Sequence, residues 1–376
     1  MNWYLCFLSH HEAWKLEDLE NEKLLTYPNV RESPLYRAVG DDTLQCGVCE
    51  RRCTILSGQL GFCKTRMNIQ GKLHTLVYGD ISTISANPIE KKPFFHFWPG
   101  SYALTIGTWS CNFTCPWCQN YDISKTNPKP SKANYLSQEK FVLMIEHEKC
   151  QGSSISFNEP TLLFEYSLDV FPLAHARGLY NTYVSNGYMT LDALRMLRNA
   201  GMDAIKFDVK GDEEAVRRYC GADVNAVWRN VGEAKRLGMH VEVVTLIIPG
   251  INDDDDCLRD IAIRHLKDAG PESPLHFTQF YPTYKMMDRP RTPVRSLEKA
   301  HSIAVKEGAR YVYAGNVTGN RLENTYCPEC GQLLIGRFGF DVTKYAITRD
   351  KRCLRCGLEI PIVGEYTRPT PSRRPF

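Results

Sequence analysis

The sequence has no long hydrophobic run and little net charge. None of its apolar stretches approaches the roughly 18 residues that a membrane-spanning helix needs. The apolar stretch from Trp3 to Leu8 is short, lacks a basic lead-in and runs into His10, so it does not resemble a secretion signal. A formal net charge of +3 is too slight to indicate nucleic acid or an acidic membrane surface as a partner.

Cysteine, by contrast, is abundant. The 376 residues include 15 cysteines, and eleven of them fall into three groups with the spacing of metal ligands. So many cysteines indicate disulfides in a small secreted protein, whereas a chain of this length with 43% hydrophobic residues can bury a large core. We therefore expect a reducing compartment, the cytoplasm. Four cysteines lack partners at metal spacing and are predicted to be buried or incidental: Cys6, Cys150, Cys220 and Cys257.

The most informative group places Cys111, Cys115 and Cys118 in the stretch CNFTCPWCQN. Three thiols are informative because a cubane iron–sulfur cluster has four irons and is normally held by four cysteines. A fourth iron without a protein ligand can bind a substrate and reduce it. The alternatives are a partial zinc site and disulfide-linked cysteines.

A second group consists of Cys46, Cys49, Cys53 and Cys63. Four thiolates complete either a tetrahedral zinc site or a fully ligated auxiliary [4Fe–4S] cluster, and both alternatives stay open beside unmetallated or redox-active thiols. A cluster could relay electrons or anchor a substrate, whereas zinc would only fold this arm of the chain.

The third group comprises two Cys-x-x-Cys-Gly knuckles, formed by Cys327 with Cys330 and by Cys353 with Cys356. Paired knuckles around a hairpin-like segment are typical of a zinc ribbon, and rubredoxin-type iron is the alternative. We expect a structural metal that contributes on the order of 10 kcal/mol to the folding of this module.

Between residues 100 and 318, β-prone runs alternate with segments of helical period. Four of the helical segments end at a glycine directly before the next β-prone run, where a left-handed conformation ends a helix: Gly178, Gly201, Gly238 and Gly308. Repeated strand–helix–strand units favour right-handed crossovers and a parallel sheet. We predict strands over Tyr102–Thr108, Ser153–Phe157, Tyr180–Ser185, Asp203–Val209, His240–Ile248, Leu275–Tyr281 and Arg310–Ala314.

Polar residues follow six consecutive strands at their carboxyl ends. They are the three-cysteine loop, Asn158–Glu159, Ser185–Asn186, Asp208 to Lys210, Asn252 and Tyr281. Periodicity alone does not separate a curled partial barrel from an open doubly wound sheet. Consecutive carboxyl ends converge on one site only if the sheet curls, so the placement favours an α/β partial barrel.

The three-cysteine loop, with the aromatic Trp117 before its last cysteine, resembles the signature of radical SAM enzymes. The resemblance implies a partial (β/α)6 barrel with a [4Fe–4S] cluster on Cys111, Cys115 and Cys118. It also implies that the open iron chelates the amino and carboxylate groups of S-adenosylmethionine, whose reductive cleavage releases a 5′-deoxyadenosyl radical. An oxygen-sensitive open cluster favours an anaerobic cell.

The resemblance extends to residues that would contact the cofactor. Asn158-Glu159-Pro160 stands where the family often has a Gly-Gly-Glu-Pro-like segment, with Phe157 and Asn158 in place of the glycines. It implies that Glu159 binds the methionyl ammonium; the alternative is an acid at a helix entry. Ser185-Asn186-Gly187 resembles the segment that contacts the ribose or the methionyl end, although Ser-Asn-Gly is also ordinary turn chemistry.

Lys206, Asp208 and Lys210 share one face of a strand, where charge is costly unless it lines a site. This part resembles the glycyl-radical activases, in which an Asp-x-Lys segment holds an aspartate near a bound cation and a lysine near the cofactor carboxylate. The resemblance gives these roles to Asp208 and Lys210. A buried ion pair is the alternative.

The order of segments from Cys46 to about Gly364 resembles the AmmeMemoRadiSam-system branch of radical SAM enzymes, often labelled pyruvate formate-lyase-activating-enzyme-like. The family association implies AMMECR1-like and Memo-like proteins as partners, beside an electron donor such as ferredoxin or flavodoxin. Lys91, Lys92 and His96 would enter the substrate mouth if the arm covers the barrel, or form a solvated connection.

We thus expect five regions: an N-terminal arm (1–45), a four-cysteine metal-binding segment (46–99), the radical SAM barrel (100–318), a zinc-ribbon or rubredoxin-like module (319–366) and a disordered tail (367–376). The expected function is reductive cleavage of S-adenosylmethionine and hydrogen abstraction from an unidentified substrate, as in glycyl-radical activation of a protein. The alternatives are radical modification of a small molecule, a lipid or RNA. A non-enzymatic zinc-ribbon nucleic-acid-binding protein is the alternative from another class.

Overall fold

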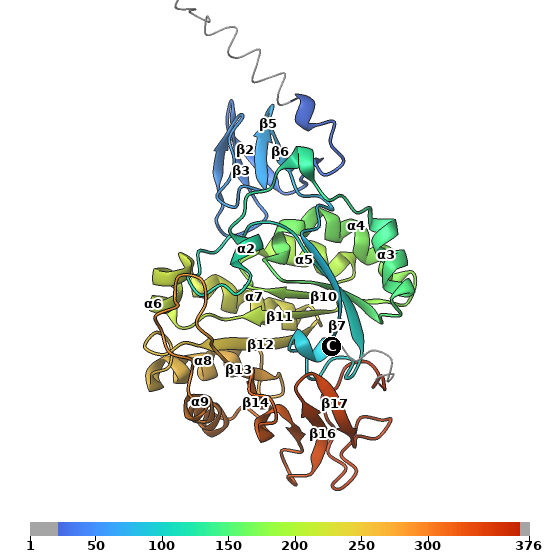
Figure 1. Cartoon of the computed structure of the whole chain (residues 1–376), viewed down its shortest axis with the longest axis vertical. Coiled ribbons are helices and arrows are strands. Elements are labelled where there is room, and N and C mark those ends of the chain that lie inside the picture. The colour runs from blue at the N-terminus through green and yellow to red at the C-terminus, as the bar shows by residue number, and fades with distance from the viewer. Residues whose placement is uncertain (1–21, 369–376) are drawn as a thin grey trace, which may run out of the picture.

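A computed structural model describes residues 22–368 of the chain. A small β-rich arm, a central α/β layer and a C-terminal β module follow one another along the long axis of the molecule (Figure 1). Within the described residues, every helix is too short or too polar to cross a membrane.

The central sheet has eight strands in the spatial order β14-β13-β12-β11-β10-β9-β8-β7. β7 pairs antiparallel with β8, and the pairs from β8 to β14 are all parallel. The strands are β7 (Thr83–Pro88), β8 (Tyr102–Gly107), β9 (Gly152–Ile155), β10 (Tyr180–Ser185), β11 (Ala204–Asp208), β12 (His240–Ile247), β13 (Leu275–Gln279) and β14 (Val312–Gly315). The seven predicted strands are thus present with small shifts at their ends, and the parallel sheet is confirmed.

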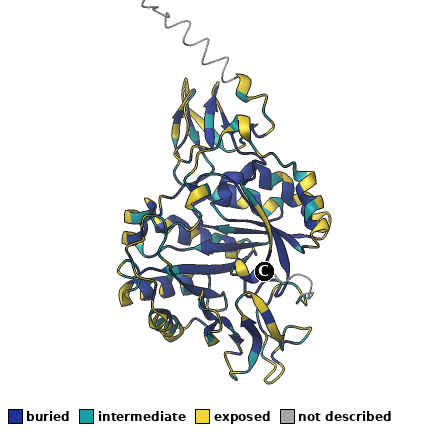
Figure 2. Cartoon of the chain, in the orientation of Figure 1, coloured by how far each residue is buried: buried dark blue, intermediate teal, exposed yellow. Residues whose placement is uncertain are grey.

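Helices connect successive parallel strands and pack beside one another in chain order. They are α2 (Tyr121–Ser124), α3 (Gln138–His147), α4 (Phe164–His175), α5 (Leu191–Ala200), α6 (Glu213–Ala215), α7 (Val224–Arg236), α8 (Asp255–Asp268) and α9 (Val294–Glu307), with 3-10 turns η1 (Ile89–Lys91), η2 (Pro130–Lys132), η3 (Pro160–Leu163) and η5 (Arg321–Glu323) and a π-helical turn η4 (Val216–Cys220). The glycine stops are confirmed, because Gly178, Gly201, Gly238 and Gly308 all have positive φ. Dark-blue buried faces of these helices lie against the sheet, and exposed faces point outward (Figure 2).

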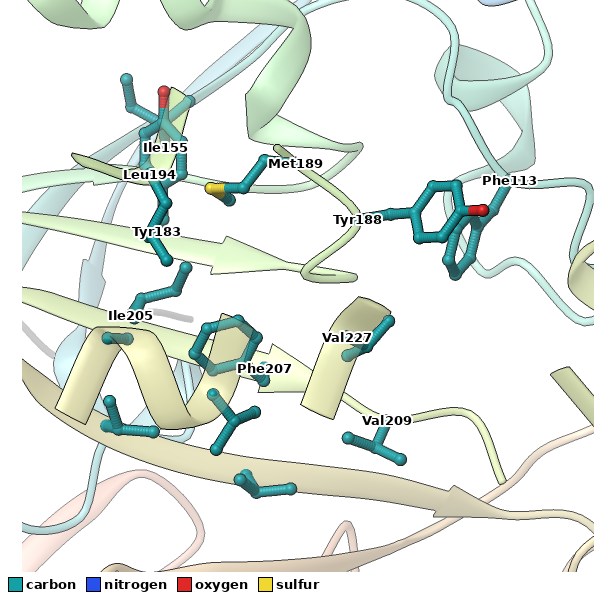
Figure 3. Packing of buried hydrophobic residues seen from close by; sticks show 14 of the residues in the cluster. Phe113, Ile155, Tyr183, Tyr188, Met189, Leu194, Ile205, Phe207, Val209 and Val227 are labelled. Atoms are coloured by element: carbon teal, nitrogen blue, oxygen red, sulfur yellow. The ribbon is translucent and has the colours of Figure 1, made fainter. Parts of the chain in front are cut away.

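The core between the sheet and its helices is continuous. Ile205 and Phe207 of β11 are fully buried, and Figure 3 shows Phe207 beside Val227 of α7. Each such side chain contributes roughly 1.5–3 kcal/mol by leaving water. Farther along the same cluster, Phe113 of the three-cysteine loop packs edge-on against Tyr188, with ring centroids 5.3 Å apart. The core therefore fixes one side of the cysteine loop.

The arm consists of two three-stranded antiparallel sheets. One contains β1 (Arg31–Glu32), β6 (Lys72–Thr75) and β5 (Arg66–Ile69), and the other β2 (Tyr36–Gly40), β3 (Thr43–Cys46) and β4 (Thr54–Leu56). β3 runs across the boundary expected at residue 45, so the four-cysteine group and the residues before it form one unit. Arg66 of β5 makes a bidentate ion pair with Glu165 of α4, at 2.5 and 3.0 Å, which docks the arm on the central layer.

The C-terminal module is a three-stranded antiparallel sheet of β15 (Thr325–Tyr326), β16 (Leu333–Phe338) and β17 (Asp341–Tyr345) with its own small core. It meets the central layer through residues 95–99: Val363 pairs with Phe97, and Arg337 donates to the Phe95 carbonyl at 2.7 Å. The tail expected to be disordered begins at Thr367, whose N–H donates to the carbonyl of Pro99. Residues 369–376 of that tail lie outside the described residues.

Residues 89–97, between β7 and β8, fill the amino-end side of the sheet interior; we call them the plug. Phe94 and Phe97 pack there against Tyr180 and Ala204 at the starts of β10 and β11. The buried carboxylate of Glu242 accepts the backbone N–H groups of Phe95 and His96 at 2.8–3.0 Å. The plug therefore closes the amino-end side and leaves the carboxyl ends as the free side.

Candidate functional site

A cavity of about 290 Å³ lies at the carboxyl ends of the parallel strands. Most of its lining comes from the loop after β8 and from β9 to β14 or the residues just after them: Cys111, Cys115, Trp117, Cys118, Phe157, Asn158, Glu159, Val184, Asn186, Lys206, Asp208, Lys210, Val244, Leu246, Thr278 and Asn316. Seven parallel strands reach one cavity of this size only because the sheet curls. The convergence predicted for the carboxyl-end residues is therefore present, although Ser185, Asn252 and Tyr281 do not line the cavity.

The three cysteines reach the cavity from one irregular loop. Phe113 N–H points at Cys111 Sγ (3.4 Å), and Lys125 Nζ donates to the Phe113 carbonyl at 2.7 Å. Asn186 Nδ2 donates to Asn112 Oδ1 at 2.7 Å, which ties the loop to the end of β10. The contacts of Lys125 and Asn186 hold the loop through groups other than its sulfurs.

Trp117 also lines the cavity and is buried, with its ring tilted against Tyr219. Its indole N–H has no hydrogen-bond partner among the described residues. A buried indole donor without a partner is costly, so this N–H is suited to an acceptor supplied by a bound molecule.

Glu159 is a buried junction between two carboxyl ends. One carboxylate oxygen accepts from Thr161 N and Oγ1 and from Ser185 Oγ, and the other accepts from Asn186 N at 2.9 Å. Burial raises the pKa of Glu159, against these hydrogen bonds. Glu159 also has the alternative role of an acid at a helix entry, because its side chain caps η3 by accepting from Thr161 N. A carboxylate with four protein donors has most of its accepting positions used, so its direct binding of an ammonium stays a prediction.

Asn158, the neighbour of Glu159, bonds to the start of the cysteine loop. Its Oδ1 accepts from Thr108 N at 2.9 Å and its Nδ2 donates to the Ser110 carbonyl at 2.8 Å. Before it, Phe157 has φ 66°, a left-handed conformation that glycine adopts freely and phenylalanine does not. In this conformation the centroid of the Phe157 ring lies 4.7 Å from Lys92 Nζ.

Lys206, Asp208 and Lys210 line one wall of the cavity, as their shared strand face predicts. Asp208 contacts Lys206 Nζ through one oxygen and Lys210 Nζ, at 3.2 Å, through the other. Burial raises the pKa of Asp208, but the two lysines more than offset this and hold it below its usual range. Burial lowers the pKa of Lys210, yet the charges of Asp208 and of the Cys115 and Cys220 sulfurs raise it overall. The three residues therefore form a buried ion pair and line the cavity at the same time.

Two features near the cavity were not predicted from the sequence: the contact of Cys220 with Cys115 and the burial of Lys92. Cys220, at the end of η4, is buried with its Sγ 3.4 Å from Cys115 Sγ, and this contact lowers the pKa of Cys115 to about 7. Burial near Lys91 and Lys206 lowers the pKa of Lys92 to about 7. Lys91 lines the cavity, whereas His96 is fully buried in the plug and bonds Tyr313 at 2.7 Å. Of the three residues expected at the mouth, His96 therefore lies away from it.

The four cysteines of the C-terminal module form a compact site, with all four sulfurs within 4.8 Å of one another. The Sγ distance is 3.5 Å from Cys327 to Cys356 and 3.7 Å from Cys330 to Cys353. Both knuckles close with the same backbone bond, in which the glycine N–H donates to the first cysteine's carbonyl at 2.9 Å.

One superfamily model and several sequence relatives match the chain. Residues 106–261 match the model of the radical SAM superfamily. The uncharacterized protein MJ0808 of Methanocaldococcus jannaschii is 38% identical over 335 residues, which cover 89% of this chain and 100% of that protein. The probable GTP 3′,8-cyclase of Pyrobaculum aerophilum is 26% identical over 40% of this chain and 49% of that protein.

Solved structures give weaker matches. A domain of pyruvate-formate lyase-activating enzyme from Bacteroides vulgatus covers 44% of this chain and 99% of its own length at 12% identity, with a TM-score of 0.39. A radical SAM methyltransferase from Sphaerobacter thermophilus covers 81% of this chain and 84% of its own length at 12% identity, with a TM-score of 0.45. The sequence matches carry the assignment: the chain belongs to one family with MJ0808 and contains a radical SAM superfamily domain over residues 106–261.

Proposed function

We propose that the chain cleaves S-adenosylmethionine reductively and uses the resulting 5′-deoxyadenosyl radical to abstract hydrogen from a substrate. The observation that supports this most is the single cavity that three cysteines share with the carboxyl ends of the parallel strands. The superfamily implies a [4Fe–4S] cluster and S-adenosylmethionine, which together supply the electron and the sulfonium that accepts it.

The residues present fit these groups. Three cysteines line the cavity. The neighbouring Cys220 contacts Cys115 but does not line the cavity. A three-thiol set is what a cluster with one open iron requires. The unpartnered indole N–H of Trp117 offers a donor at the same wall.

For the cofactor, we propose that Lys210 attracts the methionyl carboxylate and that Asp208 fixes the position of Lys210. The charges of Lys210 and Lys125 both act on Cys115, and of these two lysines only Lys210 lines the cavity beside the cysteines. Leu246, on the neighbouring strand, lines the same cavity and offers an apolar surface for adenine. Ser185 Oγ and Asn186 N both donate to the carboxylate of Glu159, which fixes the turn after β10 at the edge of the cavity.

Within this chemistry, the wall formed by the plug favours a small substrate over an inserted protein loop. Lys91 and Pro93 line the cavity directly, and Lys92 lies behind Phe157. Glycyl-radical activation of a partner protein would need a loop that enters from the free carboxyl-end side, and this wall limits how far such a loop could insert. A reductant of the ferredoxin or flavodoxin class is required in either case.

The test is anaerobic production of 5′-deoxyadenosine from S-adenosylmethionine and dithionite by the reconstituted protein. The parent and the control Cys257→Ala, which removes a buried cysteine of α8, should both form product. Cys115→Ala should form none. If a parent whose three-cysteine loop holds a complete cluster forms no 5′-deoxyadenosine, the claim that S-adenosylmethionine is cleaved without a second substrate is refuted. If Cys115→Ala forms the product, the assignment of the reaction to the three-cysteine loop is refuted.

A further inference from the structure

The arm's four cysteines surround one small apolar cavity beside the central layer. Cys46, Cys49, Cys53 and Cys63 all line it, together with Val48, Ile55, Phe62 and Leu162. Cys46, Cys49 and Cys63 are buried and Cys53 is half-buried. Four thiols that share an apolar cavity are the donor set of a soft metal or an iron–sulfur cluster.

The spacing of the sulfurs separates the two kinds of site within this one molecule. A tetrahedral zinc ion with Zn–S distances of about 2.3 Å holds its sulfurs about 3.8 Å apart. The C-terminal cysteines meet this condition, with all four sulfurs within 4.8 Å. Elsewhere in residues 22–368, no three cysteine sulfurs are that close together, so both the arm set and the three-cysteine loop are wider. In the spacing of its sulfurs, the arm set therefore resembles the three-cysteine loop and differs from the C-terminal set.

The surroundings of the arm sulfurs suit a buried anionic cluster. Phe62 N–H points at Cys53 Sγ at 3.4 Å, and the Thr65 hydroxyl lies 3.1 Å from Cys63 Sγ. The guanidinium of Arg66 is buried and interacts electrostatically with Cys46 and Cys63. Hydrogen bonds to sulfur, charge and low exposure are the factors that set the potential of a cluster.

The arm site also abuts the radical site. Arg51, between Cys49 and Cys53 in the chain, donates from Nε to the Asn112 carbonyl at 2.9 Å. The same guanidinium donates to the Cys220 carbonyl at 3.2 Å. Asn112 is the neighbour of Cys111, so one hydrogen bond joins the two cysteine groups. A zinc ion would be redox-inert at this position.

We propose that the arm holds a second [4Fe–4S] cluster, which passes one electron to the cluster at the three-cysteine loop. A ferredoxin- or flavodoxin-class donor loses one electron, the arm cluster gains it and then gives it up to the loop cluster; no bond forms or breaks in these steps. The metal assignment stands on the arm alone, and the transfer role rests on the proposed function.

The first experiment counts metals in anaerobically reconstituted protein. The parent should contain about eight irons and about one zinc ion per chain. A loop variant carrying Cys111→Ala, Cys115→Ala and Cys118→Ala should keep about four irons and a reducible [4Fe–4S] signal in electron paramagnetic resonance, with the arm untouched. A loop variant with no iron and a second zinc ion would overturn the proposal.

Two further variants assign the sites. Cys49→Ala should lose about four irons and keep the loop cluster, whereas Cys330→Ala should lose only zinc. If Cys49→Ala fails to fold, the loop variant still decides the metal, because its arm is native. Cys257→Ala controls for the loss of a buried cysteine outside the three groups.

Proximity has its own readout. In the fully reduced parent, magnetic coupling between the clusters should broaden the resonance signal, and the signal should sharpen in both the loop variant and Cys49→Ala. A parent spectrum equal to the sum of the two variant spectra would overturn the electron-transfer role. None of these measurements uses cofactor cleavage, so failure to form 5′-deoxyadenosine would count against cleavage without substrate and leave the metal assignment intact.

Discussion

Replacing Arg66 by methionine should loosen the arm from the central layer. Arg66 and Glu165 are 3% and 6% exposed in their side chains, and their two contacts measure 2.5 and 3.0 Å. Arg66→Met keeps an unbranched apolar stem and removes the charged guanidinium. Glu165 then stays buried without a cation, which costs about 3–5 kcal/mol when one partner of a buried pair is lost.

The assay is hydrogen exchange measured by mass spectrometry on reconstituted protein. Amides of β5 and α4 should exchange faster by about two to nearly four orders of magnitude, since each 1.4 kcal/mol is tenfold. The double variant Arg66→Met with Glu165→Met should recover part of the loss, because it removes the unpaired charge as well. Iron content is determined on the same samples, since Arg66 lies near Cys46 and Cys63.

Arg177→Met is the matched control. Arg177 pairs with Glu146 at the same 2.5 Å, but their side chains are 43% and 42% exposed. Solvent screens such a pair, so its loss should cost no more than about 1 kcal/mol. Equal effects of Arg66→Met and Arg177→Met, with iron retained in both, would refute the argument that burial makes the arm contact strong.

Three more outcomes are expected. The pKa of Lys92 falls from the ordinary 10.5 to about 7 in the fold, so holding this lysine charged costs the folded state up to roughly 5 kcal/mol. The parent should therefore gain stability between pH 7 and pH 10, as Lys92 loses its proton in the folded state. Lys92→Met should raise the melting temperature most at pH 6, and its advantage over the parent should shrink by pH 9. Burial raises the pKa of Glu242, but His240 and His276 more than offset this and hold it below its usual range. Glu242→Gln should therefore lower the melting temperature above about pH 4.5 and have little effect in strong acid. An equal loss of melting temperature in the two pH ranges would contradict this. Cys220→Ser should keep the parent's iron content, because Cys220 does not line the cavity; loss of about four irons would make it a ligand.

Much of the fold could be predicted because its signals are local. A glycine after a helical period, as at Gly201 with φ 111°, marks a helix end through the geometry of one residue. Charged residues at alternate positions, as at Lys206 and Asp208, mark a polar strand face in the same way. The wall of the cavity formed by β11 followed directly from this pattern.

Other parts of the site depend on contacts between distant segments. Cys220 is 105 residues from Cys115, and nothing in its neighbourhood distinguishes it from an incidental cysteine. The position of His96 depends on Glu242, 146 residues later, which binds its backbone N–H. Phe157 stands where the enzymes that the chain resembles often have glycine, a residue that favours a left-handed position, and here its ring packs against Lys92.

The plug has a consequence for how the protein is made. Arg337 of β16 donates to the carbonyl of Phe95, 242 residues earlier, and Val363 pairs with Phe97. A growing chain therefore exposes the plug, including the cavity-lining Lys91 and Pro93, long before the module that clamps it leaves the ribosome. Contacts of such sequence separation form late because their loop-closure entropy must be overcome first. The cavity at the carboxyl ends is thus completed only after synthesis of the last module, whose four cysteines come together at the same stage.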